Sequence, residues 1–101
     1  MPKFVVQIDP DLKDLIPGFL ANKRNDTEAI ISAANAHNTD FESLGRIGHR
    51  LKGEGGSYGL DAISAYGAEI ELAAKSCDLE TIRRCARELC EYLESVDVVY
   101  E

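Results

Sequence analysis

The spacing of apolar residues constrains this chain more than any other feature, because it is helical almost throughout. Four long stretches carry an apolar residue every three or four positions, and short runs of turn-forming residues separate them. The stretches extend from Pro17 to Ala34, from Leu44 to Leu51 and on into several glycines, from Ile63 to Ala74, and from Ile82 to Val96. Four helices with short connections predict an all-α fold, an antiparallel (up-down) four-helix bundle.

The beginning of the chain departs from this pattern. Residues 3–8 have a β-like composition, but a lone strand has no partner, so we expect residues 1–8 to form an extended lead-in packed on the bundle. A short helix should begin near Asp9 and end near Ile16, because Pro17 removes a backbone donor and restricts the residue before it. We therefore predict a single domain over residues 1–101, with the helical bundle over about 9–98.

Turn and cap residues predict where the helices begin. Thr39 or Asp40 can cap the second long helix, Asp61 the third and Asp78 the fourth. The connections between the helices are then only a few residues long, which favours antiparallel neighbours.

Composition and charge exclude several classes of function. The net charge of −7 argues against nucleic acid and anionic membranes as partners. No apolar run approaches the roughly 20 residues of a membrane span, and the first residues lack a signal-peptide pattern. Cys77, Cys85 and Cys90 form an odd set without a disulfide framework, which favours reduced thiols in a cytoplasmic protein. No Cys or His pair has the spacing of a metal site.

The most informative segment is the second helix, because His49 lies on its exposed side. At about 100° per residue, Leu44, Ile47 and Leu51 cluster on one side and His49 points roughly opposite. Gly55 falls nearer the core side, as does Gly59. The residues within about 60° of the histidine are Gly45, Arg46, Lys52, Gly53 and Gly56.

The exposed glycines need a reason, since each glycine inside a helix costs about 1 kcal/mol relative to alanine. We interpret them as an open border that lets the active site of another protein approach the imidazole. Lys52 and Arg46 can place positive charge near an anion held on the ring. Spacing alone leaves an ordinary surface histidine equally open, and that is what we expect of His37.

Two further patterns carry less information. The stretch Gly53–Tyr58 nearly mimics a dinucleotide fingerprint, but no strand precedes it and a tyrosine occupies the last glycine position. Three acidic residues of the third helix, Asp61, Glu69 and Glu71, are expected to form a solvated face.

The string His49-Arg50-Leu51-Lys52-Gly53, followed by Gly59 after a run of small residues, resembles the signature of histidine-containing phosphotransfer (HPt) domains. The helical layout on both sides is also similar, so the resemblance spans nearly the whole chain. It implies that His49 carries a phosphoryl group, that Lys52 supports this group electrostatically, and that Gly53 keeps the surface open. Gly48, where such sequences often have alanine, and the glycine-rich Glu54-Gly55-Gly56 are departures from the pattern.

The resemblance also implies a role and partners. The chain would be a phosphorelay intermediate between a hybrid sensor histidine kinase and the receiver domains of response regulators, in a bacterial cytoplasm. We expect no cofactor in the chain itself, because Mg²⁺ belongs to the partner receiver domain, and no kinase activity, because no nucleotide-binding segment is visible. We also expect a monomer. Two alternatives remain: a docking or inhibitory module that is never phosphorylated, and a dimerising fragment of a larger sensor.

Overall fold

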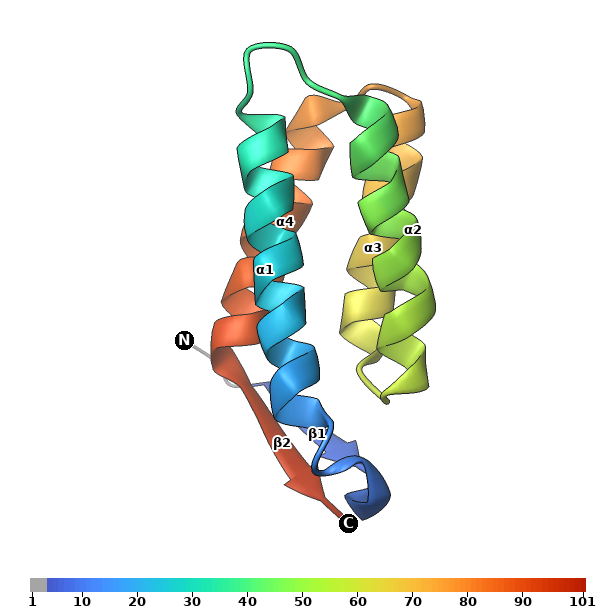
Figure 1. The fold of residues 1–101 in the computed structure, drawn as a ribbon, viewed down its shortest axis with the longest axis vertical. Coiled ribbons are helices and arrows are strands. Elements are labelled where there is room, and N and C mark those ends of the chain that lie inside the picture. The colour runs from blue at the N-terminus through green and yellow to red at the C-terminus, as the bar shows by residue number, and fades with distance from the viewer. Residues whose placement is uncertain (1–3) are drawn as a thin grey trace.

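Four long helices make up most of the computed structural model, which describes residues 4–101. They are α1 (Ile16–Ala34), α2 (Phe41–Ser57), α3 (Asp61–Lys75) and α4 (Leu79–Ser95). Successive helices run in opposite directions along the long axis of the molecule (Figure 1). The predicted all-α, antiparallel four-helix bundle is therefore confirmed.

The bundle is built from two helix pairs. Helix α2 packs most closely along α3, and helix α1 packs along α4 (Figure 1). Helix α4 packs on α3 as extensively as on α1, whereas α1 touches α2 at few positions. The stacked rings of Phe19 and Tyr58, with centroids 4.1 Å apart, join α1 to the end of α2. Each helix contributes fully buried aliphatic side chains to the common core, among them Ile16, Ile30, Leu44, Leu51, Ile63, Ile70, Ile82 and Leu89.

Two of the predicted helix caps are confirmed. The carboxylate of Asp40 accepts a hydrogen bond from Ser43 N at 3.1 Å, and that of Asp78 accepts one from Thr81 N at 3.2 Å. The third prediction is wrong, because Asp61 is the first residue of α3 and not its cap. Gly59 makes the turn instead: its φ of +77° lies in the left-handed region that favours glycine.

The entry into α1 follows the expected division in part, because the short helical segment before it ends at Leu12 and not near Ile16. A 3₁₀ turn, η1 (Pro10–Leu12), precedes the helix, and α1 begins at Ile16 with Pro17 in its first turn. Proline is tolerated there because the first amides of a helix have no partner within the helix.

Two strands flank the helices in the described part of the chain, and neither was predicted from the sequence. Strand β1 (Phe4–Ile8) pairs in parallel with β2 (Val96–Tyr100), so the expectation that these first residues stay unpaired is wrong. Residues 1–3 lie outside the described part of the chain. The bundle also ends at Ser95 and not near residue 98. The valines and the tyrosine of β2 favour an extended backbone, and pairing with β1 gives the backbone N–H and C=O groups hydrogen-bond partners.

Candidate functional site

His49 lies in the middle of α2, on the side of the helix that faces away from the core. Its side chain is 73% exposed, whereas Leu44 and Leu51 on the same helix are completely buried. The predicted orientation of the histidine is therefore correct. Because the apolar side chains fix the rotation of α2, they also fix the direction in which the imidazole points.

A carboxylate from the neighbouring helix contacts the imidazole. Glu71 Oε2, on α3, lies 2.7 Å from His49 Nδ1. A carboxylate oxygen accepts hydrogen bonds, so Nδ1 carries the proton and donates it. In the neutral ring the lone pair is then on Nε2. The expectation that Glu71 belongs to a solvated face is wrong, since only 17% of its side chain is exposed.

Lys52 completes a short chain of polar contacts. Its Nζ lies 3.5 Å from Oε1 of Glu71, so the two oxygens of one carboxylate face an imidazole and an ammonium group. Burial alone would raise the pKa of the Glu71 carboxyl. The hydrogen bond from His49 and the charges of His49, Lys52 and Lys75 outweigh that effect, and the pKa of Glu71 is lowered. Glu71 is thus a carboxylate at neutral pH.

The predicted open border around His49 is only partly open. A Cβ atom built at Gly53 would meet nothing within 4 Å, but one at Gly45 would contact Ala74 at 3.6 Å. Gly56 is exposed, yet its N–H donates to Ser64 Oγ at 2.7 Å, which ties it to α3. Open access to the imidazole therefore explains the glycine at position 53, but it is not enough to explain Gly45 and Gly56.

Three other glycines let α2 and α3 approach each other closely. A Cβ at Gly48 would lie 2.7 Å from Glu71 N, and one at Gly67 would lie 2.7 Å from Gly48 O. Gly55 is similarly packed against Ser64. Because these contacts are with backbone atoms, a side chain at Gly48 or Gly67 would force the helices apart. The close approach is what brings Glu71 within hydrogen-bond distance of His49.

A mostly apolar recess of about 550 Å³ adjoins the histidine toward the start of α2. Phe41, Gly45 and Ala74 line it, and charged side chains surround its rim. Arg46 is one of these, but its guanidinium lies 2.9 Å from Glu42, so its charge is balanced there. The recess is a place where an apolar side chain of another protein could dock beside the imidazole.

Comparison with known families agrees with this arrangement. The sequence matches the Hpt domain family over residues 14–98, a segment that begins just before α1 and extends into β2. The chain belongs to the Hpt domain family. No curated protein and no solved structure gives a significant match. Membership implies histidine phosphotransfer in two-component phosphorelays. None of the helices described for this Hpt domain is long and apolar enough to cross a membrane.

Sequence reasoning missed Glu71 and Gly67, although a signal for both was present. In an antiparallel helix hairpin, positions about equally far from the turn lie opposite each other. The turn is at Gly59, so His49 faces the neighbourhood of Glu71, and Gly48 the neighbourhood of Gly67 and Glu71. The rotation of α2 alone does not reveal either residue, because both depend on the packing of α3 against it.

The other reactive side chains of this Hpt domain lie elsewhere. His37 is exposed in the connection between α1 and α2. Cys85 is buried, and burial together with its hydrogen bond to Glu69 raises the pKa of the thiol to about 12, so it stays protonated. Within residues 4–101, no group of three His, Cys, Asp or Glu side chains is arranged to hold a metal ion.

Proposed function

We propose that this Hpt domain accepts a phosphoryl group on Nε2 of His49 and passes it to an aspartate of a receiver domain. The observation that carries the proposal is the hydrogen bond between His49 Nδ1 and Glu71. It directs the protonated nitrogen toward α3 and leaves the nucleophilic nitrogen on the exposed side. His37 has no hydrogen-bond partner among the described side chains that would orient its ring in this way.

The transfer step needs little from this chain beyond positioning. The Nε2 lone pair would attack the phosphorus of a phospho-aspartate in line with the breaking bond. A P–N bond forms, the P–O bond to the aspartate breaks, and its electron pair stays on the aspartate carboxylate. As the ring takes on positive charge, the ionised Glu71 that holds the Nδ1 proton would stabilise it. Transfer to a second receiver is the reverse of this step.

Lys52 would support the phosphoryl group after transfer. Its ammonium group now faces Glu71 at 3.5 Å and is half exposed, so a small movement of its flexible stem would bring it to a phosphoryl oxygen. Lys52 would then lie between the carboxylate of Glu71 and the new anion. This chain would need no cofactor, because the receiver domain would bring the Mg²⁺ that phosphoryl transfer requires.

The partner would dock over the surface next to His49. Gly53 offers room on one side of the imidazole, and the apolar recess bordered by Gly45 and Arg46 offers it on the other. Exposed Gly56 continues this surface toward the end of α2. We infer that response-regulator receiver domains, and the receiver of a hybrid sensor kinase, bind there in the cytoplasm.

The main experiment separates the chemistry from docking. Wild type, His49→Gln and, as a matched control, His37→Gln would each be incubated with a radiolabelled phospho-receiver and separately with labelled phosphoramidate, a small phosphodonor that needs no docking. We expect acid-labile, base-stable phosphate on wild type and His37→Gln with both donors, and none on His49→Gln. Label that persists on His49→Gln would show that another residue is phosphorylated. Receiver binding without label on wild type would favour a docking or inhibitory module instead.

A second experiment tests the role of Glu71 as a positioning residue. In Glu71→Ala the Nδ1 proton loses its acceptor, so we expect slower transfer by on the order of tenfold. The ¹⁵N chemical shifts of the ring should also move toward the tautomer protonated on Nε2. Glu69→Ala removes a carboxylate from the same helix without touching His49 and serves as the control. Unchanged ring shifts in Glu71→Ala would remove the positioning role.

A further inference from the structure

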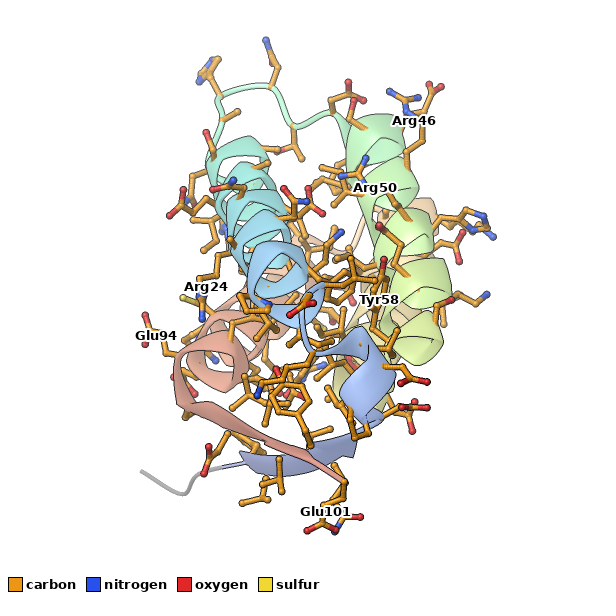
Figure 2. All side chains as sticks on the ribbon, turned by 60° about the horizontal axis from the view of Figure 1, so that its bottom comes forward. Arg24, Arg46, Arg50, Tyr58, Glu94 and Glu101 are labelled. Atoms are coloured by element: carbon orange, nitrogen blue, oxygen red, sulfur yellow. The ribbon has the colours of Figure 1, made fainter. Side chains whose placement is uncertain are left out.

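The seam between α1 and α4 forms a second surface, away from the histidine. Two adjoining recesses of about 340 and 90 Å³ follow the seam, and Ile31 and Cys90 border both of them. Ala34 and Ala86 line the larger recess, which is mostly apolar, and the side chain of Ile31 is 36% exposed. Figure 2 shows Arg24 and Glu94 of this surface on the side opposite Arg46 and Arg50 of α2. We call it the α1–α4 face.

Charged side chains of both signs border the two recesses of the α1–α4 face. Arg46, Arg50 and Arg84 each form an ion pair within the chain, at 2.7 to 2.9 Å. Among the described residues, the charged side chains that border the two recesses form no such ion pair; they are Arg24, Arg83, Arg87, Glu28, Glu91 and Glu94. Three positive and three negative charges make this face neutral in a chain of net charge −7.

These charges are separated along the seam. Arg83 and Arg87 precede Cys90 on α4 and lie beside the end of α1, where Arg83 donates to Ala34 O at 3.1 Å. Glu91 and Glu94 follow Cys90 on α4. Glu28 of α1 lies beside this same part of α4, because α1 and α4 are antiparallel. At that end Arg24 already donates to Leu93 O at 3.2 Å, which holds its guanidinium near the backbone of α4.

We propose that two copies of this chain associate through the α1–α4 face about a two-fold axis that passes near Ile31 and Cys90, in the plane of the contact and perpendicular to the helices. Such an axis turns the second copy end to end, so the arginine end of one copy covers the acidic end of the other. Arg87 would then face Glu94 of the partner subunit, twice per dimer. Ile31 of each copy would pack in the shallow apolar recess beside the seam. The monomer expected from the sequence is the alternative to this dimer.

A second copy is favoured over an unrelated partner because the face is complementary to itself. It carries both signs of charge in equal number, and its apolar centre lies between an end with two arginines and an end with three glutamates and Arg24. A neutral contact also limits the repulsion that two chains of net charge −7 would otherwise feel. The contact would cover neither His49 nor the recess beside it, so the dimer would present two separate phosphotransfer sites.

The first measurement is sedimentation equilibrium of the wild-type chain at physiological ionic strength, from low micromolar to millimolar concentration. We expect a reversible monomer–dimer equilibrium, because a contact with a small apolar centre among charged side chains belongs with weak, transient interfaces. A single monomeric species over the whole range would overturn the proposal.

A charge exchange then tests the surface and the orientation. Arg87→Glu alone and Glu94→Arg alone each place like charges opposite each other, so we expect each to weaken dimerisation about tenfold or more. An equimolar mixture of the two variants should recover it, because the mixed dimer contains two opposite-charge pairs. Dimerisation that is unaffected by both single changes would place the contact elsewhere. A mixture that fails to recover would exclude the end-to-end arrangement.

The matched controls reverse the same charges on the other side of the bundle. Arg46→Glu and Glu42→Arg change an exposed ion pair of α2 and should leave the dimerisation constant as in wild type. An equal weakening by these controls would show that net charge, and not the α1–α4 face, governs association. Circular dichroism would verify that all four variants are folded.

Discussion

The two helix pairs of the bundle are held together in different ways. Between α2 and α3, Gly48 and Gly67 allow backbone to approach backbone, and the pair presents the imidazole and the carboxylate that orients it. Between α1 and α4, alanines line the seam, and arginine side chains reach across it to backbone carbonyls. The difference shows that the glycines of the site-bearing helix serve geometry as well as access. They set the distance between helices, and that distance determines whether Glu71 reaches His49.

The largest expected effect comes from closing the space between α2 and α3. In Gly67→Ala the new Cβ would meet Gly48 O at 2.7 Å and Leu51 Cβ at 2.8 Å, so the helices would have to separate. We expect the free energy of unfolding to fall by about 3 kcal/mol, measured by urea denaturation. The control is Gly18→Ala in α1, where a Cβ would meet nothing within 4 Å. Similar unfolding midpoints for both variants would contradict the role given to the close approach.

A smaller effect of opposite sign is expected at Gly53, the open glycine of α2. Gly53→Ala adds a methyl group where nothing lies within 4 Å and removes the flexibility of glycine from a helix interior. We expect the protein to become more stable by about 1 kcal/mol. A destabilised Gly53→Ala would mean that α3 contacts this position.

The same position should affect docking when the side chain is larger. We expect Gly53→Trp to slow phosphoryl transfer from a phospho-receiver about tenfold, since its ring would occupy space next to the imidazole. Labelling by phosphoramidate should stay as in wild type. If both donors are slowed equally, the ring acts on the histidine itself and not on the approach of the partner.

The smallest effect concerns the helix caps, one in each pair. Hydrogen bonds from the Ser43 side chain and backbone lower the pKa of Asp40, and those from Thr81 lower the pKa of Asp78. A carboxyl whose pKa is lowered in the folded state stabilises the fold at pH values above its unfolded pKa of about 3.9. This contribution is lost as the pH falls through the pKa of the folded state. Asp40→Asn and Asp78→Asn keep a capping side chain but do not titrate there. We expect the urea midpoint of each variant to fall less steeply with decreasing pH than the midpoint of wild type. The difference from wild type should be similar for the two variants.

Much of the fold could be predicted because its signals are local. The apolar period, the caps at Asp40 and Asp78 and the break at Pro17 each act within one or two turns of helix, and all of them are seen in the structure. The exposed position of His49 followed from the same period. Family resemblance then connected that position with phosphotransfer, a conclusion that helical geometry alone could not reach.

What was missed depends on contacts between distant parts of the chain. The role of Glu71 needs the register of α2 against α3, and the tight contact at Gly48 needs the distance between them. The strands are the extreme case, since Phe4 pairs with Val96 across nearly the whole sequence. A five-residue valine-rich segment at the end of a helical pattern has no local feature that distinguishes a last helical turn from a strand.

The parallel pairing of β1 and β2 has a mechanical consequence. Phe4 lies beside Val96 and Ile8 beside Tyr100, so the outer ends of the two strands, at Phe4 and Tyr100, lie at opposite ends of the pair. Tension applied to the two ends of the chain would therefore pull the strands past each other and load their hydrogen bonds together, instead of opening them one after another. The four helices lie between the two strands in the sequence, so they would be shielded from the load until this small sheet ruptured.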